Sequence, residues 1–401
     1  MTVKFEKSIA KGRMMAPPSK SMAHRYLICG AFSKGSVVKK IDFSDDIKAT
    51  LKCLVELGAK VEIEDNIVRI GNLDINKPIG TTTLFCNESG STLRFLIPIC
   101  LLFNKEITLT GSERLFKRSL SIYEEMCGAQ GIYFLQKENS VTLKGKLSAG
   151  KYTVRGDVSS QFISGLMFAL SQLEEDSEIN ITGKIESASY LNLTIKALAD
   201  FGVRISRIDE RTIYIKGSQS FKKRILSVEG DYSNAAFFDA FNLFGGNVAV
   251  TGLDSNTAQG DRVYKEAFEL LNKEKAIIDI SDCPDLGPIL MAVAAAKNGA
   301  TFTGTQRLKI KESDRADAMK QELNKLGAKV KIEKNKITVY KCELKTPNEL
   351  ILGHNDHRIV MAMSVLLSVT GGSILGAQAV NKSLPDFFER IKLLNIKVEE
   401  I

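Results

Sequence analysis

Two carboxylates lie in sequence contexts that suit proton transfer. Asp285 follows Pro284 and opens an otherwise apolar stretch, and Glu312 lies among the charges of the run 309–315. Neighbouring cations and burial shift the pKa of a carboxyl group, and proton carriers are tuned in this way. Plainer roles also fit the local sequence: an N-cap for Asp285 and a surface ion network for Glu312. Both interpretations stay open at this point.

Cations gather beside short polar loops along the chain. The planar fork of arginine suits carboxylate and phosphate groups, and lysine acts as a point charge. A single arginine at a helix start is usually solvated, but a repeated arrangement predicts sites for small, multiply charged anions. The ten cations concerned are Lys20, Arg25, Arg94, Arg114, Lys117, Arg118, Lys311, Arg315, Arg358 and Lys382.

Six of these polar loops each lead into a long apolar stretch, at residues 19–21, 89–92, 159–161, 231–233, 285–287 and 355–358. Serine, aspartate and asparagine favour helix starts, whose free N–H groups carry about half a positive charge. Two sets of three such helix starts facing each other would form an electropositive cleft. The stretches 162–170 and 289–296 are apolar on every face, which predicts buried helices.

An internal repeat organises the chain. The stretch 54–63 (LVELGAKVEI) returns as 323–332 (LNKLGAKVKI), and weaker copies lie in between and at the end. Each copy predicts a helix that ends at Gly or Asn and feeds a β-hairpin. The expected helix-ending residues are about 55 to 75 residues apart, and they are Gly58, Gly128, Gly202, Asn272, Gly327 and Asn395. The pattern predicts a two-lobed α/β protein of six repeats, with helices inside and sheets outside.

The composition argues against several classes of protein. The 401 residues are 44% hydrophobic and 25% charged, no apolar run reaches the roughly 20 residues of a membrane span, and no signal-peptide core opens the chain. The net charge of +8 includes no block of five or more consecutive Lys and Arg, so we expect no nucleic-acid or membrane partner. Seven scattered cysteines predict reduced thiols and a cytoplasmic location. His354 and His357 lack a third soft ligand, and phosphate-loop and dinucleotide motifs are missing, so neither a metal nor a cofactor is implied.

Six motifs, taken together and in order, resemble those of the 5-enolpyruvylshikimate-3-phosphate synthases. The resemblance runs from about residue 13 to 390, and the motifs are PPSKSMAHR at 17–25, ESGSTLR at 88–94, GDVSSQ at 156–161, KESDR at 311–315, NDHR at 355–358 and KSLPD at 382–386. It implies an inside-out α/β barrel in two domains, each of three βαβαββ repeats with buried helices and outer sheets. Residues 19–228 would form the lower domain, residues 1–18 plus 229–401 the second, and the active site would lie in the interdomain cleft.

The reaction that the resemblance implies is the addition of the 5-hydroxyl of shikimate 3-phosphate to carbon 2 of phosphoenolpyruvate, followed by loss of phosphate. Asp285 would accept the hydroxyl proton, and Glu312 and Lys20 would assist proton transfer at the enolpyruvyl carbon. Shikimate 3-phosphate would be held by Lys20, Ser21, Arg25, Ser159, Ser160, Gln161, Ser187, Asp285 and Lys311. Phosphoenolpyruvate would be held by Lys20, Gly90, Arg118, Gln161, Arg315, Arg358 and Lys382. We expect a monomer whose domains close on binding.

Two positions depart from the family pattern. Glu88 stands where a common form has Asn, which bears on the fit around phosphoenolpyruvate and on glyphosate sensitivity, and Arg307 stands where some members have Asn. The nearest alternative is the UDP-N-acetylglucosamine enolpyruvyl transferase, whose opening motif has Lys-Asn in place of Lys20-Ser21. An RNA 3'-phosphate cyclase and a non-catalytic anion-binding module are the alternatives from other classes.

Overall fold

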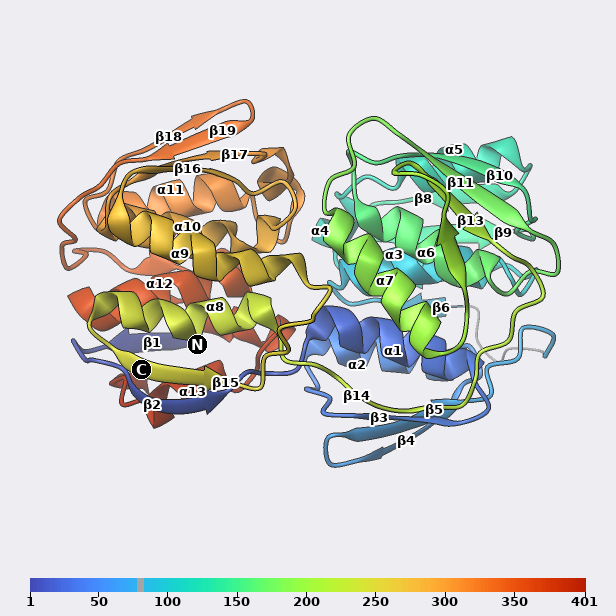
Figure 1. Ribbon diagram of the computed structural model, residues 1–401, viewed down its shortest axis with the longest axis horizontal. Coiled ribbons are helices and arrows are strands. Elements are labelled where there is room, and N and C mark those ends of the chain that lie inside the picture. The colour runs from blue at the N-terminus through green and yellow to red at the C-terminus, as the bar shows by residue number, and fades with distance from the viewer. Residues whose placement is uncertain (78–82) are drawn as a thin grey trace. The chain divides into compact units, whose positions relative to one another are not determined.

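The computed structural model describes residues 1–77 and 83–401, and it forms two compact units. One contains Pro18–Glu229 and is here called the inserted unit. The other combines Met1–Pro17 with Gly230–Ile401 and is called the terminal unit, because it includes both ends of the chain. Figure 1 labels the elements of each unit.

The inserted unit contains three four-stranded sheets built on one plan. In each, the first two strands are parallel, and the remaining neighbours are antiparallel. The strand orders are β14(Ile225–Ser227)-β3(Ser36–Lys39)-β5(Ile67–Gly71)-β4(Lys60–Glu64), β6(Thr83–Phe85)-β7(Ile107–Thr110)-β9(Ser140–Lys144)-β8(Tyr133–Gln136) and β10(Lys151–Arg155)-β11(Ser177–Thr182)-β13(Thr212–Ile215)-β12(Ile205–Arg207). The repeated plan confirms the repeat read from the sequence.

Two kinds of helix alternate in the inserted unit. The amphipathic helices lie nearer the surface and are α2(Asp45–Glu56), α5(Ser121–Ala129) and α7(Ala188–Asp200), and α4(Glu113–Phe116) is a single turn. The inner helices are α1(Lys20–Phe32), α3(Gly90–Cys100) and α6(Ser160–Leu170), and α3 packs against α6. Every residue of α3 except Ser91 is buried, and every residue of α6 except Gln161. The predicted burial of residues 162–170 is therefore confirmed, and the two less buried positions lie in the first turns, beside the polar loops.

The terminal unit repeats the plan less completely. Its sheets are β16(Ala276–Asp279)-β17(Ala300–Thr303)-β19(Lys336–Val339)-β18(Val330–Glu333), β20(Ile351–Leu352)-β21(Gly372–Leu375)-β1(Thr2–Phe5)-β22(Val398–Glu400) and the pair β15(Asn247–Thr251)-β2(Lys11–Met15). Strand β1, from the start of the chain, lies antiparallel between β21 and β22, near the chain's end. The N-terminal strand thus completes the sheet of the last repeat.

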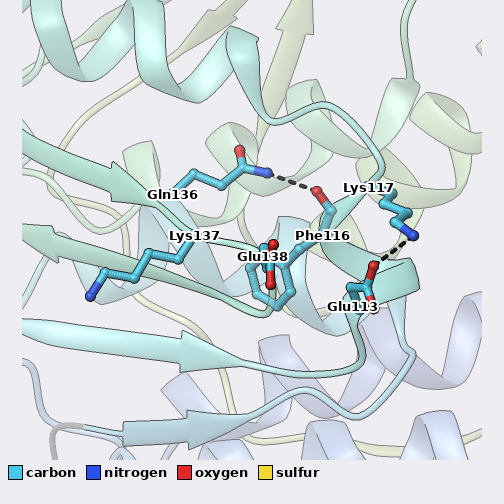
Figure 2. Close-up of a pocket in the computed structure, with 6 residues that line it drawn as sticks. All are labelled: Glu113, Phe116, Lys117, Gln136, Lys137 and Glu138. Carbon is cyan, nitrogen blue, oxygen red and sulfur yellow. Dashed lines mark hydrogen bonds and ion pairs between the residues drawn. The ribbon is translucent and has the colours of Figure 1, made fainter.

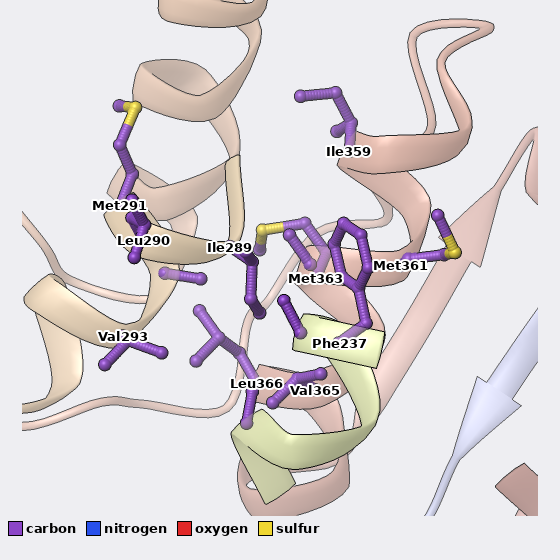
Figure 3. Packing of buried hydrophobic residues seen from close by; sticks show 14 of the residues in the cluster. Phe237, Ile289, Leu290, Met291, Val293, Ile359, Met361, Met363, Val365 and Leu366 are labelled. Atoms are coloured by element: carbon purple, nitrogen blue, oxygen red, sulfur yellow. The ribbon is translucent and has the colours of Figure 1, made fainter. Parts of the chain in front are cut away.

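The core of the terminal unit is helical. Its inner helices are α8(Tyr232–Ala240), α10(Gly287–Ala296) and α12(His357–Thr370), and its outer ones are α9(Tyr264–Lys273), α11(Arg315–Lys325) and α13(Phe387–Leu393). Short 3₁₀ turns lie at η1(Phe241–Phe244), η2(Gly260–Val263), η3(Pro284–Leu286), η4(Gln306–Ile310) and η5(Ala377–Lys382). Figure 3 shows side chains such as Phe237, Ile289 and Leu366 packed together from the three inner helices. Both units are therefore α/β with buried helices and outer sheets, as predicted.

Three details of the predicted repeat are wrong. Gly128 lies inside α5, and the left-handed residue beyond that helix is Gly131, at φ +66°. Asn272 likewise lies inside α9, which ends in extended backbone at Glu274. The strand after α9 also forms no hairpin with the next strand, because β16 pairs with β17 in parallel. The other four expected positions, Gly58, Gly202, Gly327 and Asn395, do have positive φ just after a helix.

Candidate active site

Serine side chains cap all three inner helices of the inserted unit. The Oγ atoms of Ser19, Ser89 and Ser159 accept hydrogen bonds from main-chain N–H groups of the first turn of α1, α3 and α6. A cap of this kind satisfies only part of the four N–H groups that a helix start leaves without helical partners. The three predicted loops are confirmed as helix starts, and each retains the partial positive charge that favours an anion.

Gly90, the first residue of α3, lies against two arginines. A side chain there would place its Cβ 2.9 Å from Arg118 Nη1 and 3.3 Å from Arg94 Nη1. Arg94 Nη1 donates to Gln161 Oε1 at 2.8 Å, and Gln161 Nε2 donates to Ser91 Oγ at 3.0 Å. The structure thus brings together three of the residues predicted for phosphoenolpyruvate: Gly90, Arg118 and Gln161. Glycine leaves room for the two guanidinium groups.

Lys20 and Ser21 lie at the start of α1. Lys20 Nζ donates to Asp46 Oδ2 at 2.7 Å, and the two side chains are 17% and 13% exposed. Asp46 lies in the first turn of α2, where the helix dipole favours a negative charge. The ammonium group is therefore held at a defined place, and the Lys20 side chain remains partly exposed.

Arg25 is a buried cation whose partners are uncharged. Its guanidinium donates to Thr194 Oγ1 at 2.8 Å, to the Ser21 carbonyl at 2.7 Å and to the Tyr190 carbonyl at 3.0 Å. The guanidinium carbon lies 5.2 Å from the centre of the Phe95 ring. Burial lowers the pKa of Arg25 to about 10, so the group is cationic at neutral pH.

The predicted serines lie at two further helix starts of the inserted unit. Ser159 and Ser160 are buried at the start of α6. Ser187 precedes α7 in a left-handed conformation, with φ +58°, and is also buried. A non-glycine residue at positive φ is uncommon and is a reason to look for function.

Arg315 is the centre of a charged cluster in the terminal unit. Its side chain is 1% exposed, and it contacts Asp285 Oδ1 at 2.7 Å, Glu312 Oε2 at 2.6 Å and Asp356 Oδ2 at 2.8 Å. A buried charge is stable only when it is paired and hydrogen-bonded, and here three carboxylates share one guanidinium. The cluster holds two of the three residues predicted to carry protons, Asp285 and Glu312, on the same arginine.

Asp285 is surrounded by cations. Besides Arg315, it lies 3.0 Å from Lys311 Nζ and 3.4 Å from Arg358 Nη2. Burial alone would raise the pKa of Asp285, but Arg358, Lys311 and Arg315 outweigh it and hold that pKa well below the usual value. Asp285 lies in η3, and the residues that cap η3 and α10 are Cys283 and Leu286. The plainer interpretation of Asp285 as an N-cap is therefore wrong.

Lys311 and Lys382 complete the terminal-unit set. Burial lowers the pKa of Lys311 to about 8, with the cations Arg307 and Arg315 acting in the same direction against the carboxylates. Lys382 Nζ donates to the Asn355 carbonyl at 2.6 Å. Arg358 Nη1 donates to Ser233 Oγ at 2.7 Å, which ties the start of α12 to the start of α8. The five predicted cations and carboxylates of this unit other than Lys382 therefore form one cluster. Lys382 is the last residue of η5 and contacts the loop before α12.

The comparisons with known proteins agree on one family. A family model described as EPSP synthase (3-phosphoshikimate 1-carboxyvinyltransferase) matches residues 6–391. The chain belongs to the EPSP synthase family. A 3-phosphoshikimate 1-carboxyvinyltransferase of Clostridium kluyveri is 39% identical, with 97% of this chain and 96% of the relative covered. One of Clostridioides difficile is 38% identical, with 100% and 98% covered.

The fold is also that of solved structures. An EPSP synthase structure from Acinetobacter baumannii has a TM-score of 0.79 at 20% identity, with all of both chains covered. This likeness confirms the predicted fold class. Family membership confirms the predicted reaction class, an enolpyruvyl transfer of the shikimate pathway.

Three residues that sequence reasoning left out of the site hold it together. Asp356 is fully buried, accepts from Arg315 Nε at 2.8 Å and from Ser313 Oγ at 2.9 Å, and caps α12. Asp46 pairs with Lys20, and Ser233 binds Arg358. The motif 355–358 and the loop 231–233 were visible signals for Asp356 and Ser233. Asp46 had none, because an acidic residue near a helix start is ordinary.

The described residues also form a pocket outside this cluster. A pocket of about 460 Å³ lies beside α4 and the β8–β9 hairpin, and it is lined by Glu113, Phe116, Lys117, Gln136, Lys137 and Glu138 (Figure 2). Lys117 Nζ lies 2.6 Å from Glu113 Oε1 there, so this predicted cation is paired within the pocket. Within the described residues, no group of three or more His, Cys, Asp or Glu could hold a metal ion. A search of the same residues for a helix long and apolar enough to cross a membrane found none.

Proposed function

We propose that the chain transfers the enolpyruvyl group of phosphoenolpyruvate to the 5-hydroxyl of shikimate 3-phosphate, and that both units supply ligands to the same pair of substrates. The observation that carries the proposal is Asp285, a carboxylate within 3.4 Å of Lys311, Arg315 and Arg358. Two substrates that each carry a phosphate and a carboxylate need such a concentration of fixed positive charge.

The inserted unit supplies most of the shikimate 3-phosphate site in this proposal. Its ligands there are Lys20, Ser21, Arg25, Ser159, Ser160, Gln161 and Ser187, with Asp285 and Lys311 from the terminal unit. Arg25 supports this role, because its protein partners are neutral and its charge stays uncompensated by them. Serine hydroxyls at helix starts add donors that suit a phosphate.

Both units supply ligands for phosphoenolpyruvate in this proposal. Its proposed ligands are Lys20, Gly90, Arg118 and Gln161 from the inserted unit and Arg315, Arg358 and Lys382 from the terminal unit. The contact of Gly90 with Arg118 supports the first group. The contact of Arg358 with Asp285 supports the second, since it places a substrate-binding cation beside the proton acceptor.

Asp285 takes the proton from the 5-hydroxyl as its oxygen attacks carbon 2, and a proton reaches carbon 3 through Glu312 and Lys20. The resulting tetrahedral intermediate then loses phosphate from carbon 2 and a proton from carbon 3, which Glu312 and Lys20 take back, and this elimination gives the enolpyruvyl ether. In the free protein Asp285 is a weak base, because three cations lower its pKa. Substrate anions that bind Arg358 and Lys311 add negative charge nearby, which raises the pKa of Asp285 again. The base therefore strengthens when both substrates are bound.

The rest of the proposal concerns the partners, the oligomeric state and the compartment of the protein. The partners are the two small substrates, with no nucleic acid, membrane or cofactor, and the protein acts as a monomer in the cytoplasm. Six of its seven cysteines are buried thiols, which supports a reducing compartment.

The deciding experiment measures inorganic phosphate release. Purified protein is mixed with a metal chelator, phosphoenolpyruvate and shikimate 3-phosphate, and each substrate is also tested alone. We expect phosphate only when both are present. Release with UDP-N-acetylglucosamine instead of shikimate 3-phosphate would move the acceptor to the alternative transferase. A folded protein that releases no phosphate with either acceptor would contradict the proposal and favour an anion-binding module.

A further inference from the structure

A second buried carboxylate of α11 contacts the loop that precedes α12. Glu322 is fully buried, and its Oε2 accepts from Lys325 Nζ at 2.7 Å and from the Leu352 amide at 2.9 Å. Its Oε1 lies 2.7 Å from His354 Nε2. Lys325 Nζ also donates to the Leu350 carbonyl at 2.9 Å. One carboxylate thus holds β20 and the first residue beyond Gly353.

The carboxylate of Glu322 is ionised. Burial would raise its pKa, but hydrogen bonds from His354, Lys325 and the Leu352 amide outweigh burial and hold the pKa below its ordinary value. An ionised carboxylate can only accept hydrogen bonds, so His354 Nε2 must carry a proton. The contact is therefore a charge-assisted hydrogen bond, which is stronger than one between neutral groups.

The loop that Glu322 holds has an unfavourable backbone. His354 and Asn355 follow each other in the left-handed region, at φ +48° and +52°. Gly353 has no room for a side chain, because a Cβ there would lie 2.8 Å from the Gly376 carbonyl oxygen. Conformations of this kind persist only where surrounding contacts enforce them. The bond from His354 to Glu322 is such a contact.

The same loop carries atoms that hold three site residues. The Asn355 carbonyl accepts from Lys382 Nζ at 2.6 Å. Asp356 binds Arg315 and caps α12 by accepting a hydrogen bond from the Arg358 amide. A shift of residues 354–356 would therefore move Lys382, Arg315 and Arg358 together.

We propose that Glu322 and His354 form a clasp that positions the loop 353–358, and through it the cations that bind phosphoenolpyruvate. Glu322 is a positioning residue in this role, since none of its contacts is with a residue of the proposed substrate sites. The inference rests on the proposed function for the identity of the ligand. The effect of the clasp on the loop itself does not depend on that ligand.

Three variants distinguish loss of the clasp from a general loss of stability. Glu322→Gln removes the charge and leaves the size unchanged. His354→Gln keeps an N–H donor as many bonds from the backbone as Nε2, whereas the side chain of His354→Asn is too short to reach Glu322. Asparagine tolerates positive φ better than most residues, so His354→Asn would be the milder change if only backbone strain mattered. If the bond to Glu322 matters, His354→Gln is the milder change. Glu333→Gln is the control, because Glu333 also pairs with two side chains, those of Lys331 and Lys336, but lies on the β18–β19 hairpin.

Two measurements test the proposal on the full-length protein. We expect Glu322→Gln and His354→Asn to raise the KM for phosphoenolpyruvate about tenfold, because a site displaced by an ångström loses that much or more. The KM for shikimate 3-phosphate should stay as in the wild type, and His354→Gln and Glu333→Gln should match the wild type in both constants. Hydrogen exchange of a peptide covering residues 350–358, measured without substrates, should be faster in Glu322→Gln and His354→Asn only.

The outcomes distinguish the clasp from the reaction. Unchanged exchange in Glu322→Gln would overturn the clasp, and so would faster exchange with an unchanged KM for phosphoenolpyruvate. Equal rises in both KM values would also overturn it, because they indicate a general loss of structure. A folded wild type that releases no phosphate would contradict the proposed function instead, and the exchange data would then decide alone whether Glu322 holds the loop.

Discussion

Two buried arginines, one in each unit, are held in opposite ways. Arg25 of the inserted unit donates to a hydroxyl and two carbonyl groups, and Arg315 of the terminal unit contacts three carboxylates. Burial lowers the pKa of Arg25 to about 10, whereas the three carboxylates outweigh burial and raise the pKa of Arg315. Neutral partners leave the charge of Arg25 for an anion. The charge of Arg315 is compensated by its partners, and it holds the three carboxylates close together.

The difference assigns a separate task to each unit. In the inserted unit, helix starts and hydroxyl groups surround cations, an arrangement that binds phosphate. In the terminal unit, Asp285, Glu312 and Asp356 lie around one guanidinium, an arrangement that tunes proton transfer. In the proposed function, the two acid-base carboxylates thus lie in the terminal unit, and most ligands of shikimate 3-phosphate lie in the inserted unit.

The largest effect should come from replacing the two arginines. Arg315→Met leaves three carboxylates close together without their cation, and we expect a loss of about 3–5 kcal/mol in the free energy of unfolding. Arg25→Met leaves only neutral acceptors without a donor, and we expect a loss of about 1–3 kcal/mol. Urea unfolding of both variants measures the difference. Equal losses would mean that the contrast between neutral and charged partners has no energetic consequence.

A carboxylate from each unit gives the next comparison. Asp285→Asn removes the proposed proton acceptor, and we expect kcat to fall by about 10²–10⁴-fold. Asp46→Asn keeps a hydrogen-bond acceptor for Lys20 and removes only a charge, so we expect a change of about tenfold or less, mainly in KM. Steady-state phosphate release measures both. A kcat for Asp285→Asn near that of the wild type would exclude Asp285 as the base.

The two units should also differ in their response to pH. Lys311 has a pKa of about 8, lowered first by burial, so it is charged below pH 8 and neutral above it. We expect the KM for shikimate 3-phosphate to rise about tenfold for each pH unit above 8, as the cationic form is lost. Arg25, with a pKa of about 10, keeps its charge over most of this range.

Measurements of that KM from pH 6.5 to 9.5 in the wild type and in Lys311→Arg test this expectation. Arginine stays charged throughout, so the variant should show no rise below pH 9.5. A rise at the same pH in both proteins would assign the effect to a different group. A flat wild-type profile would mean that the charge of Lys311 does not contribute to binding.

Much of this architecture was predictable because it repeats. A glycine or asparagine after a helix recurs six times in the sequence, and four of these positions have the expected positive φ. The failures at Gly128 and Asn272 arise because a helix can continue through either residue when a later one ends it, as Gly131 does. The missing hairpin after α9 depends on strand pairing across the chain, which local patterns do not encode.

The site was predictable where its residues lie in motifs, and less so where contacts are distant in sequence. Asp285 and Arg315 were found from their surroundings, but their 2.7 Å contact joins residues 30 positions apart. Asp46 and Thr194 are ordinary helix residues whose roles appear only when α2 and α7 are packed beside α1. Glu322 resembles any helix glutamate in sequence, and only its complete burial sets it apart.

The smallest effect should come from removing one of several neutral partners of Arg25. Thr194 Oγ1 accepts from Arg25 Nε at 2.8 Å and shares a hydrogen bond with Ser164 Oγ at 2.7 Å. Thr194→Val removes both bonds and also the one that Thr194 Oγ1 donates to the Tyr190 carbonyl at 3.1 Å, and we expect a loss of about 1–2 kcal/mol in stability. The KM for shikimate 3-phosphate should rise only a few-fold, because the Ser21 and Tyr190 carbonyls still orient the guanidinium.

Thr142→Val is a suitable control for that variant, since Thr142 shares a hydrogen bond with Thr108 across the outer sheet of the inserted unit. It should leave both KM values unchanged. A rise in the KM for shikimate 3-phosphate of a hundredfold in Thr194→Val would mean that Arg25 depends on a single partner. The inserted unit would then hold Arg25 as strictly as the terminal unit holds Arg315, and the contrast between the two arginines would fail.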